Sequence, residues 1–544
     1  MEYDVLINGG GPVGCGLAIE LGQRGVRVAL VERYPKPQLV PKGQNLTQRT
    51  MEHFLAWGCE EELRQAHPIP EGAGIGGMTC YGTLLTDHHY DWLNRAQVRD
   101  YYACANARLP QYETEAVLRA RLSQLDTVDV LLGWQGDAVR QGKESVTLDI
   151  SERDGSGRKS LIGSYLVGCD GSKSLVRTQS EIGETLSDHN KLMALLVFRS
   201  KELHKLLERY PGKAFYNVLH PDFEGYWQFF GRVDHGHSWF FHAPVPLGTT
   251  SDNFDFCAML TRAVGTEFEF DIDYVGFWDL RVAVADTYQN GRVFIAGDAA
   301  HSHPPYGGYG INLGFEDARN LGWKLAATVQ GWGGPALLDS YSKERQPVFS
   351  STASEFIEKF IKDDRTFLNT HRPGDDNFEL LWQGRNKNAE DVLEFAPNYV
   401  GSPIIGGQGR PSARGSHQFQ ARAGHHLAPG HLADGTDIFR GLDAKFSLLT
   451  ADKSQLSDMS ASPVEVHQMS AETAKKYQAK NILVRPDHYV ALSDDLGSVS
   501  HSCGIGIAFL NWNGSFTFMR SLHTKTTEEV NKCLEKNGLQ HRVL

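Results

Sequence analysis

The chain has few of the features that mark secreted, membrane or nucleic-acid-binding proteins. Its eight cysteines are scattered and form no C-x-x-C pair or metal-ligand spacing, so reduced thiols, a cytoplasmic location and no metal site are expected. No run of 18 apolar residues and no cationic leader occurs, so neither a membrane span nor a secretory signal is expected. The net charge of −12 without a basic block argues against nucleic acid or an anionic membrane as partner.

What the chain does contain is ordinary globular sequence interrupted by glycine-rich turns. Hydrophobic residues make up 41% and charged residues 22% of it, as in folded domains. Its 544 residues are long for one domain, so two or three are expected.

The N-terminal segment has the pattern of a dinucleotide-binding βαβ unit. The expected elements are a strand, a helix and a second strand, at residues 3–8, 16–24 and 26–31. Gly9, Gly11 and Gly14 fit G-x-G-x-x-G, in which glycines allow the backbone to approach a pyrophosphate closely. Glu32 closes the second strand, where an acid binds a ribose hydroxyl and disfavours a 2′-phosphate. FAD or NAD is therefore expected, and not NADP.

The stretch from 291 to 325 combines a second strand, acid and helix start. A short apolar strand ends at Asp298, which places a carboxylate where open α/β sheets bind ligands. A loop rich in glycine and proline follows, and then an amphipathic helix whose N-terminus holds Gly310, Ile311 and Asn312. Unpaired N–H groups and the helix dipole favour negative charge there.

This stretch resembles the second FAD fingerprint of the class A flavoprotein aromatic hydroxylases, the para-hydroxybenzoate hydroxylase fold. The family pattern of G-D-A-A-H, two prolines, G-x-N and D-A-x-N-L is matched at residues 297–301, 304–305, 310–312 and 317–321. The resemblance implies FAD as the cofactor, with Asp298 on its ribityl chain. It also implies that Pro305 lies close to the isoalloxazine and that the backbone of Gly310, Ile311 and Asn312 faces its pyrimidine edge. By this resemblance, Pro305, Gly310 and Ile311 are the catalytic residues.

Three further segments align with elements of the same family and add residues to the expected FAD site. They are the basic connection after the second strand, Leu109-Pro110-Gln111, and a D-G-x-x-S-x-V-R motif at 170–177. The residues implied at the cofactor are Arg33, Lys42, Gln44, Gln111 and Asp170. Structural alternatives stay open: a solvated loop at Lys42, an ordinary exposed Gln111, and a turn with a serine N-cap at Asp170.

Aromatic-rich runs with partial alternation between residues 190 and 290 predict an antiparallel sheet with one covered face. By the resemblance this sheet roofs the flavin and forms the far wall of a substrate pocket. The candidate pocket residues are Tyr216, Tyr226, Gln228, Phe230, Trp239 and His242. Core packing is the alternative for each, because aromatic residues are ordinary strand formers.

From about residue 401 the composition shifts to glycine, histidine, proline and serine, which indicates a loop-rich boundary. Strands are expected beyond it at 445–451 and 481–492, and a helix at 526–535. The two strand segments resemble the thioredoxin-like C-terminal domain of phenol hydroxylase, 3-hydroxyphenylpropionate hydroxylase and the polyketide aromatic hydroxylases. Because this domain has no C-x-x-C motif, thiol redox chemistry is not expected. We expect the domain to have a packing or dimerisation role instead.

The expected architecture is therefore α/β combined with α+β. A Rossmann-type FAD-binding domain would comprise residues 1–180 and 285–400. An antiparallel-sheet substrate domain would comprise 181–284, and a thioredoxin-like domain 401–544.

By the resemblance, the function is that of an FAD-dependent monooxygenase. NADH or NADPH reduces the flavin, O2 adds at flavin C4a, and the resulting hydroperoxide hydroxylates a small phenolic or amino-substituted aromatic substrate. A homodimer is expected. Epoxidation, halogenation or reduction on the same fold remains an alternative, although the W-x-W-x-I-P motif of flavin halogenases is absent. A non-catalytic FAD-containing partner protein is the other alternative.

Overall fold

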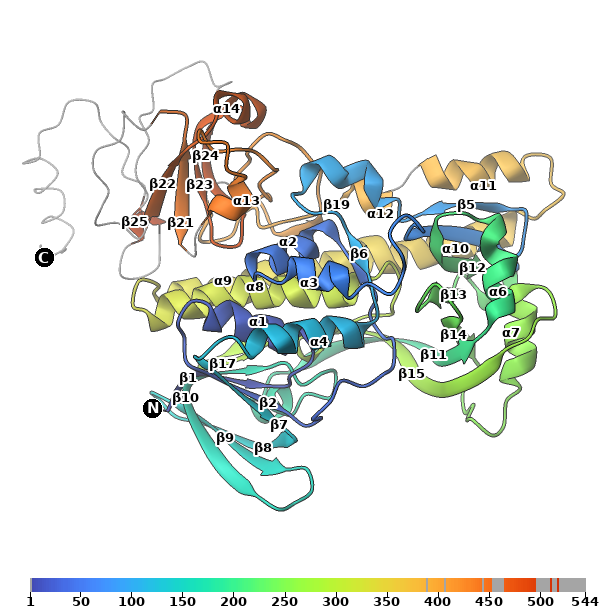
Figure 1. Cartoon of the computed structure of the whole chain (residues 1–544), viewed down its shortest axis with the longest axis horizontal. Coiled ribbons are helices and arrows are strands. Elements are labelled where there is room, and N and C mark those ends of the chain that lie inside the picture. The colour runs from blue at the N-terminus through green and yellow to red at the C-terminus, as the bar shows by residue number, and fades with distance from the viewer. Residues whose placement is uncertain are drawn as a thin grey trace, which may run out of the picture.

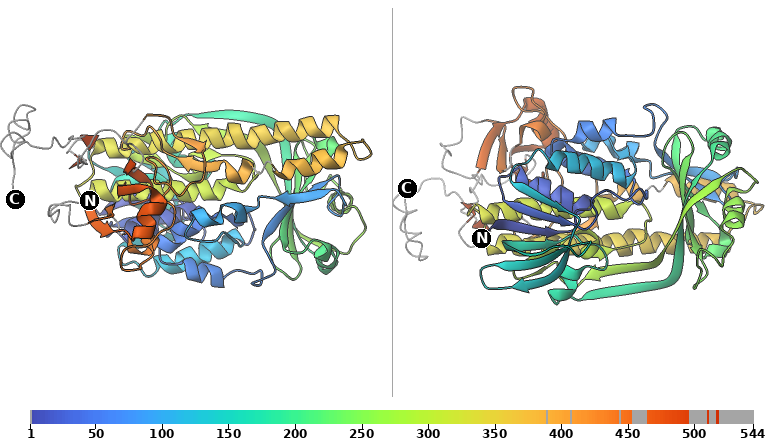
Figure 2. Two further views of the ribbon diagram at one scale, coloured as in Figure 1. Left: turned by 90° about the horizontal axis from the view of Figure 1, so that it is seen from above. Right: turned by 60° about the horizontal axis from the view of Figure 1, so that its bottom comes forward.

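The computed structural model describes residues 2–387, 390–405, 408–442, 445–452, 464–495, 509–510 and 516–517. Two eight-stranded sheets lie at opposite ends of the main body, and a four-stranded sheet from the C-terminal part lies beside it (Figure 1). A continuous helix runs from the first sheet toward the second (Figure 2). It consists of α9 (Pro335–Ser351), the π-helical segment η5 (Thr352–Glu358) and α10 (Lys359–Thr370). The predicted mixed α/β fold is confirmed.

The first sheet has a parallel centre, in the order β17-β10-β1-β2-β7. These strands are β1 (Tyr3–Asn8), β2 (Val28–Glu32), β7 (Val128–Leu132), β10 (Arg158–Gly168) and β17 (Val293–Ile295). The antiparallel additions are β8 (Trp134–Gln141), β9 (Val146–Glu152) and β16 (Gln289–Asn290). Because the central strands are parallel, the residues that follow β1, β2, β10 and β17 meet at one edge.

Helices α1 (Pro12–Gly22), α4 (Gln111–Leu122) and α8 (Tyr309–Val329) share the main hydrophobic core with this sheet. Helix α1 begins at Pro12, earlier than the predicted 16, because proline fits the first turn, where its missing N–H is no loss. Helix α8 begins at Tyr309, after Gly308 in the left-handed region at φ 69°.

The second sheet has the order β18-β15-β11-β14-β13-β12-β4-β5. Its strands are β4 (Gly76–Tyr81), β5 (His89–Trp92), β11 (Glu184–Arg199), β12 (Lys213–Leu219), β13 (Trp227–Arg232), β14 (Ser238–Val245), β15 (Asp271–Ala285) and β18 (His301–Ser302). All pairs are antiparallel except β12 with β4. The predicted segment 181–284 therefore omits three strands, because β4, β5 and β18 join this sheet from elsewhere in the chain.

The C-terminal sheet has the order β22-β21-β23-β24. Its elements are β21 (Phe446–Thr450), β22 (Val464–Gln468), α14 (Ala471–Tyr477), β23 (Ala479–Val484) and β24 (Val490–Asp495). The single strand predicted at 481–492 is wrong, because Pro486 and His488, with φ 64°, turn the chain between β23 and β24. The helix predicted at 526–535 lies outside the described residues.

Shorter elements connect these layers. The helices are α2 (Gln48–Ala56), α3 (Glu60–Gln65), α5 (Leu175–Gln179), α6 (Lys201–Leu206), α7 (Phe256–Val264), α11 (Phe378–Lys387), α12 (Glu390–Leu393) and α13 (Ile438–Gly441). The strand pairs are β3 (Asn45–Leu46) with β6 (Ala107–Arg108), β19 (Phe395–Asn398) with β20 (Ser412–Arg414), and β25 (Phe509–Leu510) with β26 (Phe516–Thr517).

A buried ionic cluster fastens the β23–β24 turn to α8 and α9. Arg485 donates two hydrogen bonds to Glu344, at 2.7 and 3.0 Å, and also pairs with Asp487. Lys324 of α8 lies 2.7 Å from Glu344, and Trp323 Nε1 donates to Asp487 at 3.0 Å. All four charged side chains have 0% exposure, so two positive and two negative charges neutralise one another away from water.

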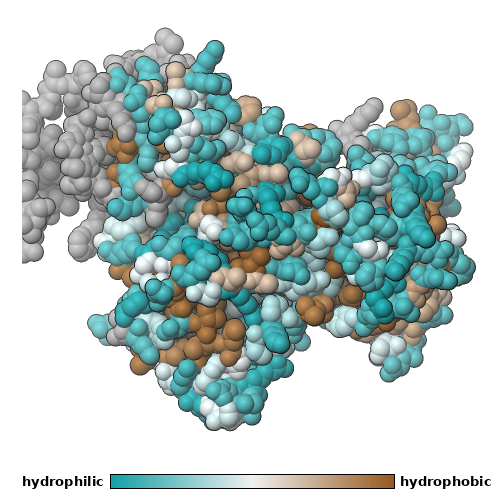
Figure 3. All heavy atoms as spheres, viewed as in Figure 1, coloured by the Kyte–Doolittle hydropathy of each residue, from teal (hydrophilic) through white to brown (hydrophobic). Residues whose placement is uncertain are grey.

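The surface gives no sign of a membrane span in the described part of the chain, where no helix has the length and apolar character to cross a bilayer. On the face shown in Figure 3, hydrophilic side chains surround separate hydrophobic groups. Such a mixture is normal for a folded protein surface.

Candidate functional site

A cavity of about 1010 Å³ runs along the carboxyl edge of the first sheet and reaches β13 and β14 of the second. Most of the residues predicted to bind FAD or substrate line it. They are Gly9, Gly11, Glu32, Arg33, Lys42, Gln44, Gln111, Asp170, His242, Asp298, Pro305, Gly310 and Ile311. Residues from distant parts of the sequence thus share one elongated space.

The three glycines of the G-x-G-x-x-G motif are needed for different structural reasons. Gly9 has a φ of 107°, and a Cβ there would lie 2.3 Å from the carbonyl oxygen of Cys169. Gly14 does not line the cavity, and a Cβ there would lie 1.9 Å from the carbonyl oxygen of Gly9. A Cβ on Gly11 would meet no heavy atom within 4 Å. Gly9 and Gly14 therefore allow close approach of neighbouring backbone. Gly9 also lines the cavity, and Gly11 leaves the cavity open.

Two acids stand at the ends of central strands. Glu32, the last residue of β2, accepts hydrogen bonds from the backbone N–H groups of Gly10 and Tyr34, both at 2.7 Å. Asp298, after β17, faces the cavity, and the surrounding protein raises its pKa by desolvation. Its carboxylate has no hydrogen bond or ion pair within the described residues. It is therefore free to accept a hydrogen bond from a ligand hydroxyl.

Asp170, in contrast, is engaged by the protein. It accepts hydrogen bonds from Asn8 Nδ2 at 3.0 Å, Ser174 Oγ at 2.5 Å and the Val176 N–H at 3.2 Å. These contacts hold the start of α5 against β1. Asp170 lines the cavity, but its described contacts match the structural alternative of a turn and a helix cap.

Two predicted glutamines also differ from each other. Gln111 is already bonded, since its Oε1 accepts from the Gly43 N–H at 3.3 Å and its Nε2 donates to Glu115 at 2.8 Å. Gln44 is buried, and neither its Oε1 nor its Nε2 has a partner. Gln44 is thus the glutamine whose side chain is free for a ligand.

The first turn of α8 brings Gly310 and Ile311 to the cavity, but the Asn312 side chain points elsewhere. Asn312 Oδ1 accepts from the Thr47 N–H at 2.9 Å and from Thr50 Oγ1 at 2.6 Å, and Nδ2 donates to the Asn45 and Gly308 carbonyls. The side chain therefore clamps the 45–50 segment onto the helix start and is not in the cavity.

Replacing Asn312 with alanine is expected to lower the free energy of unfolding by roughly 2–4 kcal/mol, because several buried hydrogen bonds are lost. Urea denaturation measures this change. Asn377→Ala, at an exposed position, is the control and is expected to lose little. A loss for N312A no greater than for N377A would contradict the clamp.

The sheet end of the cavity departs from the prediction. Tyr216 and Gln228 lie on the opposite face of the sheet, where Tyr216 pairs with Phe230 inside a separate core. Trp239 belongs to the same core, and Tyr226 hydrogen bonds to His189 at 2.9 Å, away from the cavity. The three strand residues do not line the cavity because side chains alternate along a strand, and the other parity faces the cavity.

The aromatic residues that do line this end are Phe229 and Phe240, with His242. Phe229 and His242 are directly opposite each other on β13 and β14. Sequence reasoning also missed Arg108 and His303, which line the same cavity. A strict period-two reading that started from His242 could have selected Phe240 on the same strand.

Buried polar atoms without partners gather along this cavity. They are Gln44 Oε1 and Nε2, Arg108 Nε, Arg119 Nε, His242 Nδ1 and His303 Nε2. Native proteins leave few such atoms unsatisfied unless a ligand or water completes them. Together with the free Asp298 carboxylate and the open space at Gly11, these donors and acceptors fit a long polar cofactor such as FAD.

Burial lowers the pKa of both His242 and His303 to about 4. Because the unfolded value is near 6.5, the folded state binds fewer protons between about pH 4 and pH 6.5. The free energy of unfolding of the apoprotein should therefore decrease as the pH is lowered from about 6.5 to about 4, by up to ~1.4 kcal/mol per pH unit for each histidine.

Urea denaturation at several pH values measures this dependence. The double variant H242Q/H303Q should show a shallower pH dependence, and His237→Gln, at an exposed position, should not. An unchanged slope in the double variant would contradict neutral burial of these two histidines.

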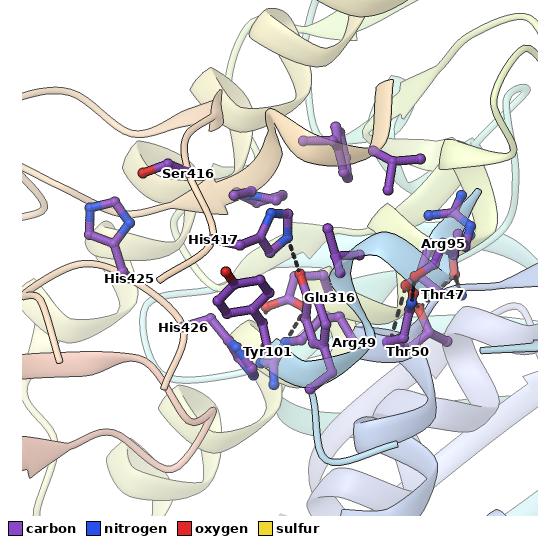
Figure 4. A pocket seen from close by; sticks show the side chains of 18 of the residues that line it. Thr47, Arg49, Thr50, Arg95, Tyr101, Glu316, Ser416, His417, His425 and His426 are labelled. Carbon is purple, nitrogen blue, oxygen red and sulfur yellow. Dashed lines mark hydrogen bonds and ion pairs between the residues drawn. The ribbon is translucent and has the colours of Figure 1, made fainter. Parts of the chain in front are cut away.

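A second cavity, of about 80 Å³, borders another part of the first turns of α8. Figure 4 shows Arg49, Tyr101, Glu316, His417 and His426 around it. An engineered cavity that binds benzene has about 150 Å³, so this space suits a few water molecules better than an aromatic ligand.

Comparison with known proteins assigns the chain to a family. A family model described as "FAD binding domain" matches residues 2–355. The chain belongs to this FAD-binding family. Its resemblance to the class A flavoprotein aromatic hydroxylases is thereby confirmed.

Two curated relatives of this FAD-binding protein are described as putative polyketide hydroxylases. The one from Streptomyces coelicolor is 31% identical over 372 residues, which cover 66% of this chain and 58% of that protein. The one from Streptomyces halstedii is 33% identical over 367 residues, which cover 64% of each. The chain thus spans less than two thirds of the length of these relatives.

A solved structure of the rebeccamycin biosynthetic enzyme RebC with reduced flavin has a similar fold. The TM-score is 0.78 at 26% identity, over 91% of this chain and 96% of RebC. This likeness extends beyond the residues matched by the family model and includes most of the chain.

Proposed function

We propose that the protein is an FAD-dependent monooxygenase that consumes NADH or NADPH and O2 and hydroxylates an activated aromatic compound. One observation carries the proposal. A single cavity runs from the glycine motif to Phe229, Phe240 and His242, and the N-terminus of α8 lies along it. The cofactor and an aromatic substrate would therefore share one cavity, and the names of the relatives support the same chemistry.

The residues divide into roles along this cavity. Gly9 and Gly11 would receive the pyrophosphate, and Glu32 a ribose hydroxyl. Asp298 would hold the ribityl chain, and Gln44, Lys42 and Arg33 would border the cofactor. We assign Gln111 and Asp170 to support of the walls, since their side chains are engaged by the protein.

At the reacting end, the protein would orient the substrate, exclude water and stabilise negative charge. Bound FAD would supply hydride acceptance and oxygen activation. The amides of Gly310 and Ile311 at the positive end of α8 would stabilise negative charge on a reduced flavin. Pro305, Phe229 and Phe240 would shield that region from water.

The test is oxidation of NADH and NADPH by the purified yellow protein, with hydrogen peroxide followed in parallel across phenols and anilines. A compound that accelerates oxidation many-fold with little peroxide is the expected result. Oxidation that appears entirely as peroxide would mean that the compound is not hydroxylated. No acceleration by any compound with either donor would overturn the proposal and favour a non-catalytic FAD protein.

We also propose that the C-terminal part is thioredoxin-like. The parallel pair β21–β22 followed by the antiparallel pairs β21–β23 and β23–β24 supports this assignment. The homodimer and the cytoplasmic location stay predictions, and light scattering of the purified protein tests the first of them.

A further inference from the structure

Arg108 is a buried cation without a counter-ion at the sheet end of the large cavity. It lines the cavity and is 1% exposed. Its guanidinium donates to the Arg232 carbonyl at 3.0 Å and to Asn45 Oδ1 at a long 3.4 Å, and Nε has no partner. Within the described residues no carboxylate forms an ion pair with it.

Its described surroundings offer aromatic rings but no negative charge. The guanidinium lies over the rings of Phe215 and Phe240, at 5.4 and 5.9 Å from their centroids. Arg232, also buried, contacts Tyr216, His204 and the Lys213 carbonyl and adds a second positive charge nearby. Burying an unpaired charge is costly, so the arrangement favours binding of an anion.

We propose that Arg108 binds a carboxylate of the substrate, so that the protein acts on aromatic acids. This inference rests on the proposed function, because it places the substrate in the cavity beside the cofactor. The free Nε–H edge suits a carboxylate, which a guanidinium binds through parallel hydrogen bonds. Phe229 and Phe240 would contact the ring, and the acid group would point to Arg108.

The position of Arg108 separates this role from cofactor binding. Arg108 is the last residue of β6, whose partner strand β3 carries Asn45. Its guanidinium lies next to Gly231 of β13. A Cβ on Gly231 would lie 2.6 Å from Arg108 Nη2 and 2.1 Å from the Phe240 ring. Arg108 therefore belongs to the sheet end, whereas Gly9, Gly11 and Glu32 form the other part of the cavity.

The test compares binding of matched acids and amides to the FAD-loaded protein. The probes are 2-, 3- and 4-hydroxybenzoate and 6-hydroxy-2-naphthoate, each with its carboxamide, and the readout is the change in FAD absorption, with equilibrium dialysis as a check. At least one acid is expected to bind about 10-fold to 100-fold more tightly than its amide, the effect of a hydrogen bond to a charged group.

Arg108→Met should bring this acid-to-amide ratio to about one, and Arg108→Lys should retain part of it. Arg232→Met is the matched control, because Arg232 is a similarly buried cation outside the cavity lining. It is expected to lower the ratio much less than R108M, because its charge lies farther from the ligand, even if it lowers stability. If R108M does not fold, R108K and R232M still separate the charge effect from the packing effect.

Equal dissociation constants within every pair, or binding of no acid, would overturn the inference. A loss of FAD from R108M or R108K with an unchanged acid-to-amide ratio would also overturn it, by placing Arg108 at the cofactor. The binding readout needs no turnover, so it is independent of the oxidation assay. Hydroxylation of neutral phenols without preference for acids would leave the proposed function in place and remove this inference.

Discussion

Replacing Gly11 with alanine is expected to weaken FAD binding by about 10-fold to 100-fold, the range that corresponds to an overpacking cost of about 1–3 kcal/mol. The backbone at Gly11, with φ −70° and ψ −174°, suits any residue, and a Cβ there meets no protein atom. The added methyl group would instead occupy cavity space next to the pyrophosphate position. Apoprotein stability should therefore be nearly unchanged. Titration of apoprotein with FAD measures the dissociation constant, and circular dichroism measures the apoprotein melting temperature.

Gly14→Ala is the matched comparison within the same motif. Its Cβ would lie 1.9 Å from the Gly9 carbonyl oxygen, so α1 would have to move away from the β1 turn. This variant should lower the melting temperature of the apoprotein itself. If G11A lowered that temperature as much as G14A, the assignment of Gly11 to cofactor contact would be wrong.

The βαβ unit could be predicted from sequence because its signals are local. Strand β1 occupies the predicted residues 3–8, and Glu32 lies at the end of β2 as expected. The elements are short, apolar and bounded by glycines, so neighbouring residues alone determine them. Element ends were less predictable, as the earlier start of α1 at Pro12 shows.

The wall of the substrate end could not be predicted in the same way. Strands β12, β13 and β14 carry aromatic residues at both parities, such as Phe215 next to Tyr216 and Phe229 next to Phe230. Both faces of the sheet are covered, one by the cavity region and one by a core with α6 and α7. The hydrophobic pattern therefore does not determine which set of alternate side chains faces the ligand. The pairing of these strands with the rest of the fold determines it.

Arg108 and the Asn312 clamp show a second limit of prediction from sequence. The pairing of β3 with β6 brings residues 45 and 108 together, and Asn312 joins a segment more than 260 positions earlier in the chain. Each residue alone resembles an ordinary polar position. Only long-range packing makes one an unpaired cation in a cavity and the other a buried clamp.

Replacing Glu344 with glutamine is expected to lower the free energy of unfolding by about 3–5 kcal/mol, the cost of breaking a buried ion pair from one side. The neutral amide would leave Lys324 and Arg485 with only Asp487 as a charged partner in the cluster. The low pKa of the Glu344 carboxyl, caused by Arg485 and Lys324 in spite of burial, indicates that the charged form is the one stabilised. Urea denaturation at neutral pH measures the loss.

Asp149→Asn is the control, because the Arg140–Asp149 pair is exposed at the surface and exposed pairs contribute little. A loss for E344Q no greater than for D149N would contradict the role of the cluster. The cluster is also connected to the cavity, because Lys324 belongs to α8, the helix whose first turn holds Gly310 and Ile311. Loosening the β23–β24 turn from α8 should therefore also speed FAD release on heating, whereas D149N should leave that rate unchanged. The C-terminal part would then stabilise the cofactor site through a helix, without contacting the cofactor.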